Sequence, residues 1–301
     1  MSNLLKSCSA IAIASLSLGG MASAAEMHLT AGAGYQYDSN VGLAGIDDNT
    51  GDADSALLLS AGIGMNWRFA STASLRLKYD FTDTRHEQFT EFDLAMHHLG
   101  AELGYRIMGV DTSLSVDTYR AGLDGESYLA MTRISPAAGY LFGTHLYVRG
   151  AWSQASKQYS LLTSRDADVE GVRGDVYWLF DGMRRYLALG IATTSEDAAD
   201  PEFDFDGTAL SLTYGQQIDY ALLDLDLRLQ LQSEQRDYLN VTSSIDAVRY
   251  DERLRASFIA GIPFSEHFEL QGQVDRVDNR SNLESAELDE VTYSMRFLVS
   301  F

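Results

Sequence analysis

Six histidines are the side chains of this sequence best suited to acid–base catalysis, because imidazole titrates near neutral pH. A hydrolase would also need a serine and an asparagine, or paired aspartates, beside the histidine. Of the six, only His86, next to Asp83 and Arg85, lies in a long polar segment where an exposed active site could form. A solvated loop histidine explains this pattern more simply. We therefore expect no catalytic residues, and a hydrolase is the weakest of the functional alternatives.

A second chemical candidate is the acidic segment that contains Glu202, Asp204 and Asp206, followed by Gly207. It superficially resembles a calcium-binding loop. The acidic ligand expected at the end of such a loop is replaced by Thr213, and carboxylates at every second position suit a strand better. We expect neither a specific metal site nor a cofactor.

The best candidate for a functional surface is a row of charged side chains at alternate positions. From Leu223 to Leu231, leucines alternate with charged and amide residues, so the two kinds face opposite sides of an extended strand. The pattern continues in the segments that follow. The row consists of Asp224, Asp226, Arg228, Arg249, Asp251, Arg253, Arg255, Glu269, Asp275 and Arg296.

Hairpin pairing of these segments predicts close approach of Asp226 to Arg255, of Arg255 to Asp275, and of Glu269 to Arg296. Two interpretations of such a mixed-sign wall stay open. The charges line a polar channel and filter its solutes, or they pair with one another because they cannot face lipid.

The elements that position this row are predicted to be β-strands, since alternation of period two recurs along the chain. Only three prolines occur in 301 residues, and beyond the N-terminal segment no run of eighteen apolar residues could form a spanning helix. An irregular phase in one segment predicts a β-bulge at His97 and His98. About fourteen strands are expected, at 27–38, 55–69, 74–85, 91–107, 110–120, 127–142, 146–157, 168–180, 185–195, 204–216, 221–234, 248–262, 267–279 and 289–301.

The connections between these strands alternate in length. Short ones are predicted at 70–73, 108–109, 143–145, 181–184, 217–220 and 263–266, and longer acidic ones at 39–54, 83–90, 121–126, 158–167, 196–203, 235–247 and 280–288. Transmembrane barrels have short periplasmic turns and longer external loops. We therefore predict an all-β fold, a transmembrane antiparallel up-and-down β-barrel, with the longer loops outside the cell.

The last segment supports this interpretation, because it alternates and ends on an aromatic residue. Tyr293, Phe297, Val299 and Phe301 share its apolar face. This pattern resembles the C-terminal assembly signal of bacterial outer-membrane barrels. The resemblance implies an integral outer-membrane protein of a Gram-negative cell that meets the barrel-assembly machinery, membrane lipid and lipopolysaccharide.

A short motif, Tyr37, Asp38, Ser39, Asn40 and Val41, ends the first strand. It resembles the Y-D-S-N-V signature of the barrels of surface lipoprotein assembly modifiers, and residues 278–282 resemble a second motif of those barrels. The resemblance implies a role in transport or translocation across the outer membrane, with a lipoprotein client. Because the first predicted strand begins within a few residues of the predicted cleavage site, we do not expect the helical-repeat domain of that family before the barrel. A general diffusion porin with a charged lumen is the alternative.

The N-terminal segment has the charged start, apolar centre and small-x-small end of a signal peptide. We expect residues 1–24 to be this peptide and residues 25–301 to be a single barrel domain. The only cysteine, Cys8, falls within the peptide, so the mature chain would have no thiol. A net charge of -21 at pH 7 makes nucleic acid an implausible partner.

Overall fold

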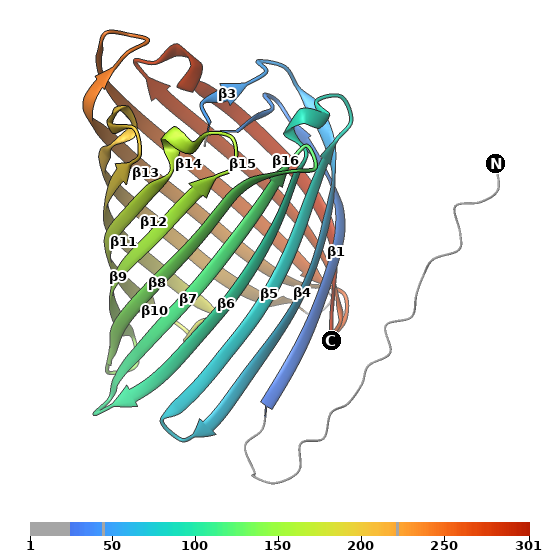
Figure 1. Cartoon of the computed structure of the whole chain (residues 1–301). Coiled ribbons are helices and arrows are strands. Elements are labelled where there is room, and N and C mark those ends of the chain that lie inside the picture. The colour runs from blue at the N-terminus through green and yellow to red at the C-terminus, as the bar shows by residue number, and fades with distance from the viewer. Residues whose placement is uncertain (1–24, 44–45, 221–222) are drawn as a thin grey trace, which may run out of the picture.

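The fold is a single closed sheet in which every strand pairs antiparallel with its neighbours, as the computed structural model shows (Figure 1). The structure describes residues 25–43, 46–220 and 223–301. The predicted signal peptide lies outside this part of the chain. Fourteen described strands form the barrel: β1 (Ala25–Asp38), β4 (Asp54–Ala70), β5 (Ala73–His86), β6 (Leu94–Ile107), β7 (Val110–Leu123), β8 (Glu126–Phe142), β9 (Leu146–Tyr159), β10 (Ala167–Leu179), β11 (Arg185–Ala198), β12 (Phe205–Tyr220), β13 (Leu223–Thr242), β14 (Ala247–Pro263), β15 (Phe268–Ser281) and β16 (Leu288–Ser300). The predicted fold class and strand number are therefore confirmed.

The two ends of the barrel differ in their connections. One end carries the single-turn 3-10 helices η1 (Thr90–Phe92), η2 (Thr163–Arg165), η3 (Pro201–Phe203) and η4 (Glu284–Ala286), together with a small hairpin of β2 (Gly42–Leu43) and β3 (Asp48–Asn49). The other end has compact turns, such as the one at Met108 and Gly109. We call the first end outer and the second periplasmic, following the rule for bacterial barrels.

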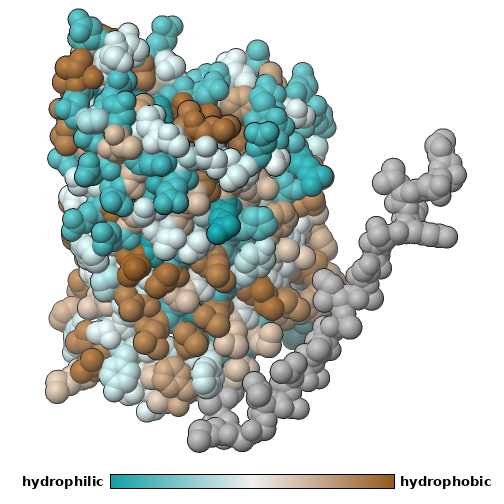
Figure 2. Space-filling view, in the orientation of Figure 1, coloured by the Kyte–Doolittle hydropathy of each residue, from teal (hydrophilic) through white to brown (hydrophobic). Residues whose placement is uncertain are grey.

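An apolar belt covers the periplasmic half of the barrel, and on the face shown in Figure 2 it is a brown band below a mostly hydrophilic upper half. Exposed apolar side chains on strands around the ring belong to this belt, such as Leu103, Ile191 and Phe297. On β13 the outward side chains are leucines up to Leu231, but further along they become Ser233, Gln235 and Asp237. A spanning strand needs only about 9–11 residues to cross the hydrocarbon core. The outer parts of the longer strands therefore stand clear of the membrane. Among the described residues, no helix is long and apolar enough to cross a membrane.

Several predicted boundaries were wrong at the outer end. The predicted loop 235–247 is largely strand, because β13 runs on to Thr242 and leaves only residues 243–246 as the turn. The predicted loop 121–126 is a two-residue turn of Asp124 and Gly125, both with positive φ (51° and 75°). The predicted bulge at His97 and His98 is absent, since β6 pairs without a register shift with both β5 and β7. Leu94 and Met96 instead face the lumen.

Three outer loops share one side-chain to backbone hydrogen bond that fixes their shape. The residue after each 3-10 helix is an aspartate whose Oδ1 accepts a hydrogen bond from a backbone amide at the end of the preceding strand. The bonds are His86 N to Asp93 at 2.6 Å, Tyr159 N to Asp166 at 2.6 Å and Ala198 N to Asp204 at 2.7 Å. Because each bond closes a short loop onto its own strand, these loops form a defined rim around the outer mouth.

Candidate functional site

The lumen wall is the candidate functional surface, and the predicted charge row lies on it. All ten residues occupy the register positions whose side chains face inward, on β13, β14, β15 and β16. Interior cavities that extend across several strands are lined by members of the row, including Asp226, Arg228, Glu269 and Arg255.

The expected partners within the row are partly wrong. Asp226 pairs in register with Gly261, whereas Arg255 pairs with Gln232, so Asp226 and Arg255 lie well apart along the wall. The error follows from the underestimated length of β13. The other two expected pairs are diagonal neighbours: Asp275 pairs with Ser257, two residues from Arg255, and Arg296 pairs with Gln271, two residues from Glu269.

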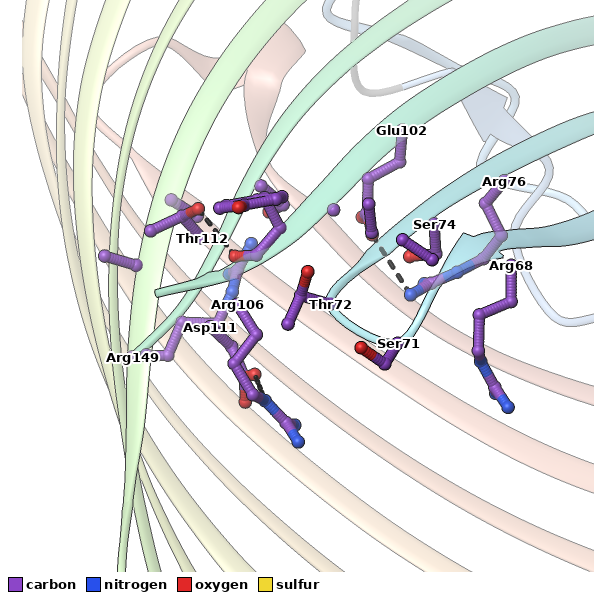
Figure 3. Close-up of a pocket in the computed structure, with 18 of the residues that line it drawn as sticks. Arg68, Ser71, Thr72, Ser74, Arg76, Glu102, Arg106, Asp111, Thr112 and Arg149 are labelled. Atoms are coloured by element: carbon purple, nitrogen blue, oxygen red, sulfur yellow. Dashed lines mark hydrogen bonds and ion pairs between the residues drawn. The ribbon is translucent and has the colours of Figure 1, made fainter. Parts of the chain in front are cut away.

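A cavity of about 630 Å³ opens in the periplasmic half of the lumen, on the wall formed by β4 to β9. Four arginines line it, namely Arg68, Arg76, Arg106 and Arg149, together with the carboxylates of Glu102 and Asp111 (Figure 3). Arg76 contacts Glu102 at 3.1 Å, and Arg106 contacts Asp111 at 2.5 Å. Arg149 forms no ion pair within the part of the chain that the structure describes. This wall is therefore basic overall.

Glycines on the same wall leave room for neighbouring side chains. Gly139 is the clearest case, because a Cβ there would lie 2.1 Å from the hydroxyl of Tyr147. A Cβ on Gly104 would lie 2.9 Å from Oγ of Ser74. A Cβ on Gly139 would force Tyr147 to move, so this glycine lets the tyrosine side chain lie close against β8 at the edge of the cavity.

The wall halfway round the ring carries the opposite charge. Asp219 on β12, Asp224 and Asp226 on β13, and Glu269 on β15 face inward near the periplasmic turns. Their basic neighbours are three: Arg184 forms an ion pair with Asp219, Arg228 lies between Asp226 and Gln230 in the row, and Arg296 lies diagonally beside Glu269. Because β6 and β7 stand opposite β13 and β14 in the barrel, the lumen has a basic and an acidic wall at the same level. Such an arrangement imposes a transverse electric field on any solute that passes.

Solved structures with the same architecture are outer-membrane proteins. OmpT of Vibrio cholerae, in its outer-membrane-expressed form, superposes with a TM-score of 0.54 at 10% identity, covering 94% of this chain and 99% of that one. An anion-selective porin from Comamonas acidovorans gives a TM-score of 0.53 at 8% identity (93% and 100% covered), and OmpF of Salmonella typhi, in complex with daunomycin, gives 0.52 at 10% (92% and 97%). This chain has the fold of outer-membrane porins.

Identities this low establish the fold and not a shared activity. No protein-family model matches the chain, and no curated protein matches it in sequence. Together with the apolar belt, the porin fold places the chain in the outer membrane as an integral protein.

The Y-D-S-N-V motif has structural contacts at the outer mouth. The backbone N–H of Asn40 donates to Oδ1 of Asp38 at 3.1 Å, and the N–H of Val291 donates to Oγ of Ser39 at 2.8 Å. Oδ1 of Asn40 accepts from the N–H of Gly51 at 2.9 Å, and Val41 is only 1% exposed. The motif therefore ends β1, ties it to β16 and anchors the first outer loop.

The second motif has the same kind of role. Asn279 donates through Nδ2 to the carbonyl of Ala286. Asn282 bridges to β14, since its Oδ1 accepts from the N–H of Tyr250 at 3.0 Å and its Nδ2 donates to the carbonyl of Val248 at 2.9 Å. These side chains fold the loop between β15 and β16 against the rim.

The acidic segment that resembles a calcium loop also supports the rim. Glu202 accepts hydrogen bonds from the N–H and the hydroxyl of Ser243 at 3.1 and 2.7 Å, and Asp204 caps the end of β11 as described above. The carboxylates of Glu202 and Asp204 therefore have backbone and hydroxyl partners. Within the described ranges, no group of three or more His, Cys, Asp or Glu side chains is placed to hold a metal ion.

The histidines occupy unexpected surroundings. Nδ1 of His86 lies 3.6 Å from Asp93, while Asp83 and Arg85, its expected neighbours, face the outside of the barrel and pair with each other at 2.8 Å. His98 lies in the lumen between Asp117 (2.8 Å) and Asp80 (3.4 Å), with its ring stacked on Tyr119 at 4.2 Å. The sequence did not indicate this cluster, because the bulge wrongly predicted at His97 and His98 would change the register of β6. The uninterrupted register places Asp80, His98 and Asp117 on the same face of the sheet.

Proposed function

We propose that this protein is a non-enzymatic diffusion channel that conducts small polar solutes across the outer membrane. The observation that carries the proposal is the pair of oppositely charged walls at one level of the lumen. Arginines of β4 to β9 face carboxylates of β12 to β15 across the barrel. Anions pass along the basic wall and cations along the acidic wall, so a solute with both charges is oriented as it crosses.

The proposal is supported by the exposure of the wall charges. The side chain of Arg76 is 62% exposed and that of Arg106 is 63% exposed, although both carry ion-pair contacts. If the arginines and carboxylates of the lumen only formed ion pairs with one another, their side chains would be packed together and shielded from water. Exposed arginines beside a cavity instead remain available to a hydrated solute.

The role in lipoprotein export implied by the Y-D-S-N-V resemblance is a separate proposal. The described contacts of Asp38, Ser39 and Asn40 are within the barrel, whereas Tyr37 is exposed on its outer face.

Planar-bilayer recordings test the channel proposal. We expect purified, folded protein to give steady ion-conducting steps in potassium chloride. Folded protein that is silent would contradict the proposal and would favour a role in translocation or assembly instead.

A further inference from the structure

Three tyrosines stand side by side on the lumen wall near the periplasmic end of the barrel. Tyr147 on β9 pairs in register with Tyr177 on β10, and Tyr186 on β11 pairs with Leu179, two residues further along β10. All three share the inward face of the sheet with Arg149. The ring centroids are 6.0 Å apart between Tyr147 and Tyr177 and 6.5 Å apart between Tyr177 and Tyr186. These rings form a continuous tyrosine row across three neighbouring strands.

Two glycines hold the outer rings of this row against the wall. A Cβ on Gly139 of β8 would meet the hydroxyl of Tyr147, and a Cβ on Gly215 of β12 would lie 2.3 Å from Cε1 of Tyr186. The two side chains therefore occupy the space where any other residue of the neighbouring strand would place its own. They lie along the wall instead of projecting towards the axis of the barrel.

A cavity of about 500 Å³ opens beside the tyrosine row. Tyr147 and Tyr177 line it together with Leu141, Leu179 and Met183. Leu141 is 42% exposed and Met183 is 63% exposed. The interior of a transmembrane barrel is usually polar, so exposed apolar side chains that line a lumen cavity are unusual. A concave apolar and aromatic surface of this volume is typical of a site that binds a small molecule.

The basic cavity described above adjoins this apolar cavity. Tyr147, Arg106 and Asp111 line both of them, so a single molecule can reach from one into the other. One part of the shared space is aromatic, and the other part carries arginines. This combination suits a solute with an apolar ring at one end and an anionic group at the other.

Arg149 is placed to bind the anionic group, since it lies on the lumen wall of β9 (Figure 3). Its register neighbour on β10, Asp175, contacts Arg173 at 2.7 Å. Arg106 contacts Asp111 at 2.5 Å. Among the residues that the structure describes, Arg149 itself forms no ion pair. Its guanidinium can therefore donate two parallel hydrogen bonds to a carboxylate.

We propose that the tyrosine row and Arg149 form a binding site for small aromatic carboxylates at the periplasmic end of the lumen. The ring of the solute stacks on Tyr147 and Tyr177, and its carboxylate accepts hydrogen bonds from Arg149. Contacts between aromatic rings add stabilisation beyond the burial of apolar area. The inference deepens the proposed channel function by naming a class of solute, and it rests on that function only for the route by which the solute arrives.

Benzoate is the probe, titrated calorimetrically into the full barrel folded in detergent at pH 7. Cyclohexanecarboxylate has the same charge without the aromatic ring, and benzyl alcohol has the ring without the charge. We expect the wild type to bind benzoate roughly three- to tenfold more tightly than cyclohexanecarboxylate, as the energy of an aromatic pair predicts. Equally tight binding of cyclohexanecarboxylate would overturn the site, and this comparison needs no variant.

Two variants separate the two parts of the site. Tyr177→Leu removes the central ring but keeps an apolar side chain, so it should weaken benzoate binding roughly three- to tenfold and change cyclohexanecarboxylate binding much less. Tyr140→Leu is the matched control, because Tyr140 pairs with Val148 on the opposite, lipid-facing side of the sheet, where it is exposed. Arg149→Gln should weaken benzoate binding roughly tenfold and leave benzyl alcohol binding unchanged.

Heat-modifiable mobility on gels checks that each variant folds. A folded Tyr177→Leu protein that binds benzoate as tightly as Tyr140→Leu would overturn the site, as would a folded Arg149→Gln protein with wild-type affinity. A barrel that conducts ions but fails these tests refutes the site alone. A barrel that passes them but never conducts refutes the channel function and leaves the site in place.

Discussion

Leu29 and Phe301 exchange a pair of backbone hydrogen bonds, from Leu29 N to Phe301 O at 2.8 Å and from Phe301 N to Leu29 O at 2.9 Å. These bonds extend the ladder between β1 and β16, the first and last strands of the barrel, to its periplasmic end. The ring of Phe301 is 65% exposed on the lipid side, where it lies 5.1 Å from the ring of His267. The terminal residue thus contributes both to closure of the sheet and to the apolar belt.

Deletion of Phe301 should lower the amount of folded barrel in the outer membrane. The deletion removes both of these bonds and the aromatic end of the last strand. The measurement is the fraction of protein with heat-modifiable gel mobility in outer-membrane preparations, with Phe301→Tyr as a control that keeps the backbone bonds and an aromatic ring. Equal amounts of folded protein for the deletion and the wild type would refute the role of Phe301 in assembly.

The orientation of the barrel can be tested at two tight turns. An epitope tag inserted between Asp124 and Gly125, at the outer end, should be reached by antibody on intact cells. A tag at Gly143, in a periplasmic turn with a positive φ of 62°, should be reached only after permeabilisation. The reverse labelling pattern would invert the topology.

Neighbouring residues on β13 test which face meets lipid. Leu229 is 40% exposed on the apolar belt, opposite Phe258 of β14, whereas Arg228 lies on the lumen wall. Leu229→Arg should destabilise the barrel by about 2–4 kcal/mol, the cost of a basic residue near the middle of the bilayer. Arg228→Gln should cost far less because the side chain stays in a polar environment. Unfolding titrations in lipid vesicles measure both, and an equal or greater loss for Arg228→Gln would show that the faces are assigned wrongly.

Sequence reasoning was accurate wherever the barrel wall separates lipid from water. Leu229 and Arg228 differ so sharply in polarity that alternation alone assigns each to its face. Above the membrane both faces meet water, so Gln235 and Arg236 give no such contrast. For that reason the outer part of β13 was taken for a loop, and the error displaced the predicted partner of Asp226.

The contact between Asp47 and Arg249 at the outer mouth could not be predicted from the sequence. Asp47 and Arg249 are separated by 202 residues, and nothing in the local pattern of either indicates the other. Their contact depends on the direction that the first loop takes across the barrel. The arginine cavity was missed for a related reason, because Arg76, Arg106 and Arg149 stand singly on different strands and converge only when the sheet closes.

Acid should weaken the contact that Asp47 of the first outer loop makes with Arg249 and Arg165. The direction of this pH dependence follows from the pKa of Asp47. Burial alone would raise this pKa, but the hydrogen bonds and charges of Arg249 and Arg165 outweigh it and hold the pKa below its ordinary value. A carboxylate with a lowered folded-state pKa stabilises the folded state above its unfolded pKa of about 3.9, and the effect is lost as the pH falls through the folded value. The nearby Asp251 keeps Arg249 in place by accepting hydrogen bonds from its Nε and Nη2.

We therefore expect Asp47→Asn to have a lower free energy of unfolding than the wild type from pH 7 to about pH 4, measured by unfolding titrations, and the difference to disappear only at lower pH. Asp48→Asn, which removes the same charge from the adjacent, exposed residue, should follow the wild type. Convergence of the wild type and Asp47→Asn already at pH 6 would show that Asp47 does not stabilise the barrel.

The two charged walls of the lumen are tested most directly by the reversal potential in a potassium chloride gradient. Arg76→Gln/Arg149→Gln removes charge from the basic wall, and Asp224→Asn/Asp226→Asn removes it from the acidic wall, at the same level of the barrel. The first double variant should shift the permeability ratio towards cations, and the second should shift it towards anions. Reversal potentials that stay at the wild-type value in both variants would contradict the account, because the walls would then not act on the solutes that pass.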